Sequence, residues 1–196
     1  MKKLHYIKDE MLVHIPICTH AQPKNILIVG GCDKIKNEVE KHKSLENILI
    51  LKEDIADQMT GLGEHFFDVA IVVDENFRTD RIFWGLLHKA LHPKGVVSTV
   101  ASTMLVQEEA FEEELKTVGE LFKIVMPYCY EEMGENGYLL CKNLLLASKA
   151  YHPTADINLQ RADLTDELNY YNSDIAIGAF QVPTISKKRF AGLIKF

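Results

Sequence analysis

The sequence predicts an α/β fold, with a mostly parallel Rossmann-like sheet that ends in an antiparallel pair of strands. Short apolar runs of the kind buried in parallel sheets recur along the first hundred residues, and segments with helical periodicity separate them. Later in the chain, two apolar runs follow each other with only a polar, glycine-containing loop between them, which is typical of antiparallel neighbours.

The first strand is expected at residues 25–31, a continuous apolar run that ends in two glycines. The helix expected at 33–43 places Ile35 and Val39 four positions apart, on one face. Three further buried strands are predicted at residues 48–51, 68–73 and 95–101.

Two longer helices separate the later strands. The helix at 81–91 ends at the Pro and Gly of residues 92–95. Its predicted apolar stripe consists of Ile82, Leu86, Leu87 and Leu91. The helix at 108–121 begins with acidic residues, as the helix dipole prefers.

The closing strands are predicted at 122–128 and 137–146, joined by a loop at 131–136. Added to a parallel sheet with right-handed crossovers, this pair indicates the S-adenosylmethionine-methyltransferase type of Rossmann sheet rather than a dehydrogenase. At 196 residues the chain is expected to form one domain. Its expected parts are an opening helix within residues 1–22, an α/β core over 23–150 and a C-terminal extension over 151–196.

Composition narrows the function classes. The net charge of −6 argues against nucleic-acid binding, and no apolar run of about 20 residues predicts a membrane span. The four cysteines show no C-x-x-C pairing, so we expect free, buried thiols in the reducing cytoplasm. The eight histidines are scattered without an H-E-x-x-H pattern, so we expect no metal site. Trp84 is expected in the core, while His14 and His20 are expected as capping or surface residues.

The turn after the first strand is the candidate ligand loop. Gly30 and Gly31 allow a close approach of the backbone, although the G-x-G-x-x-G pattern of a pyrophosphate cradle is missing. Asp33, just beyond the glycines, suits a ligand that carries a positive amine. Asp33 could equally cap the following helix, and the sequence leaves both readings open.

The chain resembles spermidine synthases through motifs at both of its ends. Residues 9–20 are similar to that family's opening helix, and residues 23–33 to the strand and glycine loop that follow it. Near the other end, residues 170–174 and 179–183 resemble the family's Tyr-Tyr-Asn and Ala-Phe-x-Leu-Pro segments. The resemblance implies aminopropyl transfer from decarboxylated S-adenosylmethionine to putrescine, with methylthioadenosine as product. It implies nucleoside and polyamine ligands, no permanently bound cofactor and a homodimer.

On the donor side, the resemblance places Asp33 on the aspartate that binds the aminopropyl amine. Lys52 falls where the family has a glutamate that binds the ribose, and a lysine cannot accept the hydroxyl hydrogens. Glu53 would substitute if the turn shifts by one residue, and Asp54 would take the role of the acid that reads the adenine.

On the acceptor side, the family's general base follows the third strand. Val73 occupies its position here, so Asp74 becomes the catalytic candidate. A one-residue slip along a strand reverses the face of the side chain, so Asp74 requires a bulge or a changed turn. The remaining substrate-binding candidates are Asp9, Glu10, Tyr130 and Glu131.

Three alternative functions are consistent with the family residues that this sequence keeps and those that it lacks. The chain is either an aminopropyltransferase with a rearranged site, a catalytically degenerate homologue that acts as a binding or regulatory module, or a small-molecule methyltransferase on the same fold. The family's small N-terminal β-domain has no counterpart before the opening helix, so a more open pocket is expected.

Overall fold

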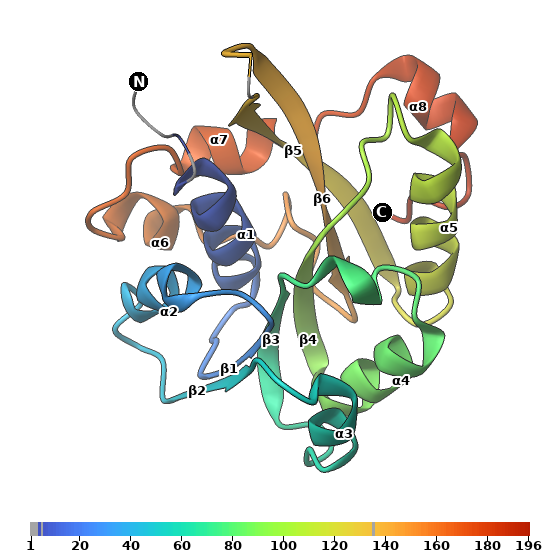
Figure 1. Ribbon diagram of the computed structural model, residues 1–196. Helices are drawn as coiled ribbons and strands as arrows, with labels where there is room; N and C mark the ends of the chain where they lie inside the picture. Colours follow the sequence, from blue (N-terminus) through green and yellow to red (C-terminus); the bar gives the residue numbers. More distant parts are fainter. Residues whose placement is uncertain (1–3, 5, 135) are drawn as a thin grey trace.

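A computed structural model describes residues 4, 6–134 and 136–196 of the chain. Its sheet has the strand order β2-β1-β3-β4-β6-β5. In that order the strands are Asn47–Leu51, Asn25–Val29, Phe67–Val72, Leu91–Val100, Leu139–Ser148 and Ile124–Met133. The first four run parallel, while β6 is antiparallel to both β4 and β5. The predicted mostly parallel sheet with a C-terminal antiparallel pair is confirmed (Figure 1).

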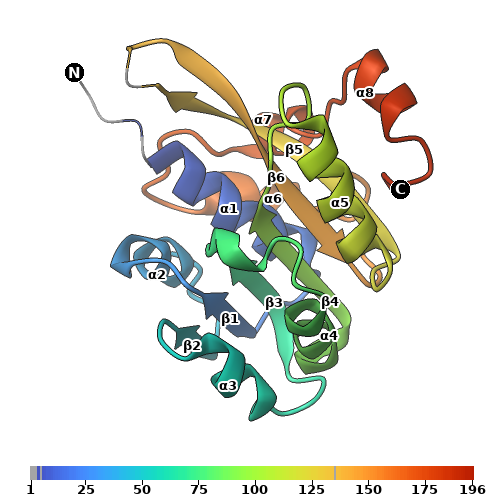
Figure 2. The ribbon, with the colours of Figure 1, turned by 45° about the vertical axis from the view of Figure 1, so that its right-hand side comes forward.

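Helices cover both faces of this sheet (Figures 1 and 2). One face carries α1 (Tyr6–Thr19), α2 (Asp33–Glu40), α6 (Leu159–Leu164) and α7 (Ser173–Gly178). The other face carries α3 (Ile55–Thr60), α4 (Arg81–Ala90), α5 (Glu108–Gly119) and α8 (Thr184–Arg189). Within the described part of the chain, none of these helices has the length and apolar character needed to cross a bilayer.

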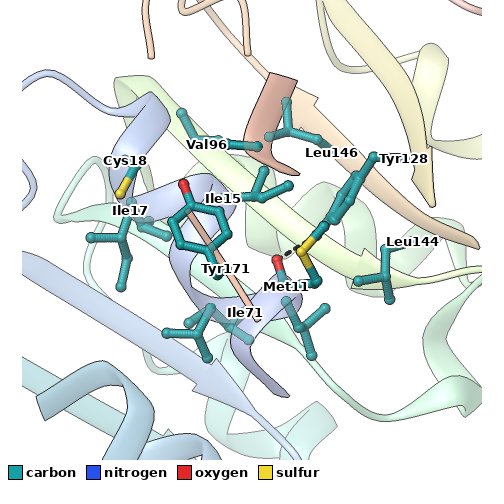
Figure 3. Packing of buried hydrophobic residues seen from close by; sticks show 14 of the residues in the cluster. Met11, Ile15, Ile17, Cys18, Ile71, Val96, Tyr128, Leu144, Leu146 and Tyr171 are labelled. Atoms are coloured by element: carbon teal, nitrogen blue, oxygen red, sulfur yellow. Dashed lines mark hydrogen bonds between the residues drawn. The ribbon is translucent and has the colours of Figure 1, made fainter. Parts of the chain in front are cut away.

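The two hydrophobic cores follow from strand geometry. Successive side chains of a strand point to opposite faces, so Ile26 and Ile28 join the core under α1, and Leu27 and Val29 join the core under α4. Figure 3 shows the first core, where Met11 of α1 lies against the sheet and its carbonyl oxygen accepts a hydrogen bond from the Tyr128 hydroxyl, at 3.3 Å.

Two predicted burial patterns are wrong. The run at 48–51 was expected to be buried, but β2 lies at the sheet edge, and Leu49 is 38% exposed. Ile82 was expected on the buried stripe of α4, but its side chain is 78% exposed. The buried face of α4 is formed by Phe83, Trp84, Leu87 and Ala90.

Other boundaries also shift. The closing hairpin differs from the prediction at both strands, because residues 131–133 of the expected loop belong to β5 and β6 runs from Leu139 to Ser148. The segment at 92–95, expected to end a helix, is a bulge at the start of β4, where the pairing with β3 jumps. His14 and His20 are buried rather than at the surface. The free thiols were expected to be buried, but Cys32 and Cys141 are exposed, because they lie in the turn after β1 and near the start of β6.

Candidate functional site

The site lies where the direction of strand addition reverses. The chain runs from β1 outward to β2 and then returns to β3 on the other side of β1. Ligands of open α/β sheets bind outside the carboxyl ends of the strands at this switch point. The turn after Val29, the turn after Leu51 and the turn after β3 meet there.

Gly30 and Gly31 shape the turn after β1. Both have positive φ, +74° and +84°, a region that L side chains rarely adopt. A Cβ on Gly30 would lie 3.0 Å from the Cβ of Asp74, and a Cβ on Gly31 would lie 3.1 Å from Cγ2 of Val73. The glycines are therefore required by the close approach of the segment after β3, whether or not a ligand is bound.

Asp33 is the first residue of α2, and Cys32 occupies the N-cap position. The Asp33 side chain is 87% exposed, and its Oδ1 accepts a hydrogen bond from Lys52 Nζ at 3.0 Å. This hydrogen bond and the charge of Lys52 lower the pKa of Asp33. The capping reading is therefore not supported, and the carboxylate already binds an ammonium group.

Glu53 and Asp54 follow Lys52 directly, and both are exposed. Asp54 occupies the N-cap position of α3 with a left-handed backbone, φ 44° and ψ 40°, and its side chain makes no capping hydrogen bond. Both residues therefore lie in the turn that follows β2, directly after the lysine that contacts Asp33.

Asp74 begins the short 3-10 turn η1 (Glu75–Phe77). Its Oδ1 accepts a hydrogen bond from the backbone N–H of Asn76 at 2.9 Å. The contact with Gly30 fixes its backbone at the switch point. Asp74 thus lies beside the glycine loop, with one carboxylate oxygen engaged in capping.

Three of the remaining candidate residues line two neighbouring cavities. Asp9, Tyr130 and Glu131 line a cavity of about 190 Å³ beside the start of α1. A second cavity of about 200 Å³, at the carboxyl end of β4, shares Lys8, Tyr130 and Glu132 with the first. Burial, followed by the charges of Glu132 and Asp9, raises the pKa of the Tyr130 hydroxyl, which therefore stays protonated near neutral pH.

Sequence reasoning missed the polar network behind the second cavity. Arg78 Nη1 donates to Ser102 Oγ at 3.1 Å, and the guanidinium also pairs with Glu75. The buried Glu114 carboxylate accepts hydrogen bonds from the backbone N–H and the hydroxyl of Ser102, at 2.9 and 2.6 Å. No sequence pattern predicts that these residues meet, because they come from three separate segments: the end of η1, the segment after β4, and α5.

Glu10 has a different task from the expected substrate contact. Its side chain is fully buried. Its two carboxylate oxygens accept hydrogen bonds from the backbone N–H groups of Asn169, Tyr170 and Tyr171, at 2.9–3.0 Å. Glu10 therefore holds the C-terminal extension against α1, and it does not line either of the two cavities.

Comparisons with known proteins agree with this architecture. The family model described as "Spermine/spermidine synthase domain" matches residues 5–59, which contain α1, the glycine loop and Lys52. A polyamine aminopropyltransferase of Helicobacter acinonychis is 28% identical over 93% of this chain and 76% of its own length. A spermine synthase of Arabidopsis thaliana is 27% identical over 95% of this chain and 64% of its own length.

A solved spermidine synthase in complex with the transition-state analogue AdoDATO superimposes with a TM-score of 0.84. The alignment covers 94% of this chain and 75% of that one, at 22% identity, and shows that the two share a fold. The chain spans between 64% and 76% of the length of these three proteins.

Proposed function

Because the chain is a divergent member of the spermidine synthase family, we propose that it transfers an aminopropyl group from decarboxylated S-adenosylmethionine to putrescine. The observation that carries the proposal is the Asp33 carboxylate at the switch point, which already holds an ammonium group 3.0 Å away. The donor's aminopropyl chain ends in the same kind of group.

Lys52 is no strong obstacle to such a donor. The Lys52 side chain is 49% exposed and that of Asp33 is 87% exposed, so water screens their attraction. An incoming ammonium can therefore replace Lys52 on the carboxylate. Glu53 and Asp54, next along the chain, supply acceptors for the nucleoside hydroxyls and the adenine amino group.

The acceptor amine would enter from the two cavities beside Tyr130. The nitrogen lone pair of putrescine attacks the methylene carbon next to the sulfonium, and the carbon–sulfur bond breaks. Its electron pair returns to sulfur, giving neutral methylthioadenosine, and the amine proton passes to the Asp74 carboxylate. Asp9 and Glu131 attract the distal ammonium.

A second candidate is a catalytically degenerate homologue that acts as a binding or regulatory module. The charges around the cavity at the end of β4 favour it. Lys8, Arg78 and Lys142 line this cavity together with Glu75 and Glu132, and such a mixed lining suits a dicationic diamine poorly.

Calorimetric titration separates the candidates. Binding of methylthioadenosine and decarboxylated S-adenosylmethionine, with S-adenosylmethionine weaker, supports the aminopropyltransferase site. Preference for S-adenosylmethionine would support the methyltransferase reading instead. Absence of binding by all three nucleosides would leave only a degenerate module.

Turnover with putrescine then tests Asp74. Asparagine keeps a capping oxygen for the N–H of Asn76, so Asp74→Asn should fold normally while losing the base. Activity should fall roughly 10²- to 10⁴-fold with nucleoside binding unchanged. Asp80→Asn is the matched control, because Asp80 caps α4 in the same way. Equal activity of the wild type and Asp74→Asn would remove Asp74 from the mechanism.

A further inference from the structure

A cluster of two histidines and one aspartate lies at the opposite end of the sheet from the proposed donor site. His20 follows α1, Asp68 is the second residue of β3, and His92 is the second residue of β4. Asp74 lies six positions after Asp68, so the cluster is roughly 20 Å from the switch point along β3.

His20 is the unusual member of this cluster. The residue is only 5% exposed. Within the described part of the chain, neither of its ring nitrogens has a hydrogen-bond partner. Its Nε2 lies 3.9 Å from Asp68 Oδ1, which is too long for a hydrogen bond. Buried polar groups are nearly always paired, so these two nitrogens require an explanation.

Asp68 is held so that one oxygen faces His20. Its other oxygen, Oδ2, accepts hydrogen bonds from the backbone N–H groups of Lys24 and Asn25, each at 2.9 Å. Carboxylates that bind metals are commonly oriented in this way by hydrogen bonds to their second oxygen.

His92 completes the cluster. One ligand atom from each of the three residues lies within 4.8 Å of the other two. The backbone N–H of Lys94 donates to His92 Nδ1 at 3.3 Å. If Nε2 of His92 binds the metal, Nδ1 carries the proton, and if Nδ1 binds, its lone pair is used. In either case Nδ1 can no longer accept from Lys94, and a hydrogen bond as long as 3.3 Å is lost at little cost.

We propose that His20, Asp68 and His92 bind one divalent transition-metal ion of the zinc class. Two imidazoles and a carboxylate form a common ligand set for such ions, whereas Mg²⁺ and Ca²⁺ prefer oxygen ligands. In a tetrahedral zinc site with bonds of about 2.0–2.1 Å, neighbouring ligand atoms are roughly 3.4 Å apart. Ligand atoms that lie up to 4.8 Å apart would have to approach one another by at most about 1.4 Å to reach that value.

Arg161 and Lys94 place positive charge near His20, which opposes any bound cation. The affinity therefore has to come from direct bonds to the imidazole nitrogens and to the Asp68 carboxylate. The bound ion would join the loop after α1 to β3 and β4. Its role is therefore structural, since it lies far from the switch point.

Thermal unfolding with and without Zn²⁺ tests this site, in a Cys32→Ser, Cys141→Ser background that removes the two exposed thiols. Zn²⁺ should raise the Tm while Mg²⁺ leaves it unchanged, and titration should give one ion per chain. Absence of a zinc-dependent shift in Tm would overturn the proposal.

Two variants assign the ligands. His92→Ala alters a partly exposed residue, and Asp68→Asn keeps an oxygen for the two backbone N–H groups, so each should preserve the fold. Each should weaken zinc binding at least about tenfold. They should also abolish the visible absorption of bound Co²⁺, whereas His152→Ala should bind as the background does. Unchanged affinity in both ligand variants would also overturn the proposal.

Discussion

At the residue scale, the donor side of the site depends on Lys52. It stands where the resemblance places a ribose-binding glutamate, and it contacts Asp33, the carboxylate that we propose for the donor's amine. A lysine offers only hydrogen-bond donors, so it contributes nothing to the ribose hydroxyl hydrogens.

Replacing Lys52 by glutamate should therefore strengthen donor binding. Lys52→Glu removes the competing ammonium and supplies an acceptor for the ribose hydroxyls. We expect the affinity for decarboxylated S-adenosylmethionine to rise about tenfold, which corresponds to the free energy of one charge-assisted hydrogen bond. Calorimetry measures this directly. Lys52→Gln is the control, because it removes the charge without adding a carboxylate. Weaker binding by Lys52→Glu than by Lys52→Gln would contradict the assignment.

Glu10 contributes to the stability of the fold rather than to ligand binding. Its buried carboxylate accepts three backbone hydrogen bonds from residues about 160 positions later in the chain. Glu10→Gln leaves one N–H facing an amide donor, which should lower the free energy of unfolding by about 2–3 kcal/mol. Urea unfolding checks this value, with the exposed Glu109→Gln as control. A change below 0.5 kcal/mol would refute the role.

At the element scale, a chain of hydrogen bonds joins α1 to α2. The Glu38 carboxylate can only accept, so His14 Nε2 donates to it at 3.0 Å. With that proton on Nε2, a neutral His14 must accept through Nδ1 from His42 Nε2, at 2.8 Å. Burial lowers the pKa of both histidines, that of His42 to about 3, so both are neutral near pH 7, as this arrangement requires.

The hydrogen bonds between His42, His14 and Glu38 predict that the folded protein loses stability in acid. Below an unfolded-state pKa of about 6.5 the unfolded histidines bind protons, while His42 in the folded state does not until about pH 3. Stability is therefore complete above pH 6.5 and falls as the pH drops toward 3, by up to about 1.4 kcal/mol per pH unit for each histidine.

Urea unfolding between pH 7.5 and 5 measures this slope. His42→Gln keeps an N–H for His14 and cannot titrate, so its stability should depend less on pH than that of the wild type. His152→Gln, in the polar loop after β6, should keep the wild-type slope. Parallel curves for the wild type and His42→Gln would reject the account.

The elements also show why the sequence predicts the fold better than the site. Apolar runs such as Ile26–Val29 identify strands covered on both faces. An equally apolar run in β2 lies at the sheet edge, because burial depends on strand order rather than on composition. The Arg78–Ser102–Glu114 network and the contacts of Glu10 have no sequence spacing, since tertiary packing alone brings those residues together.

At the scale of the whole molecule, the structure separates two regions. The carboxyl ends of the strands carry Asp33, Asp74 and the two cavities, while the amino ends carry the His20–Asp68–His92 cluster. Their separation along β3 makes the two proposals independent. Loss of zinc binding should leave nucleoside affinity unchanged, and Asp33→Asn should leave zinc binding unchanged.

The family resemblance also predicts a homodimer. Light scattering coupled to size-exclusion chromatography should give twice the chain mass at micromolar concentration. A monomer mass across the accessible concentration range would contradict this expectation and leave the rest of the account intact.

The central claim is that Asp33 recognises the aminopropyl ammonium of the donor, and a thermodynamic cycle tests it most directly. Decarboxylated S-adenosylmethionine carries that ammonium and methylthioadenosine lacks it. We predict that the wild type binds the former more tightly and that Asp33→Asn abolishes this preference, while Asp57→Asn, at an exposed acid of α3, retains it. A preference that survives unchanged in Asp33→Asn would contradict the claim.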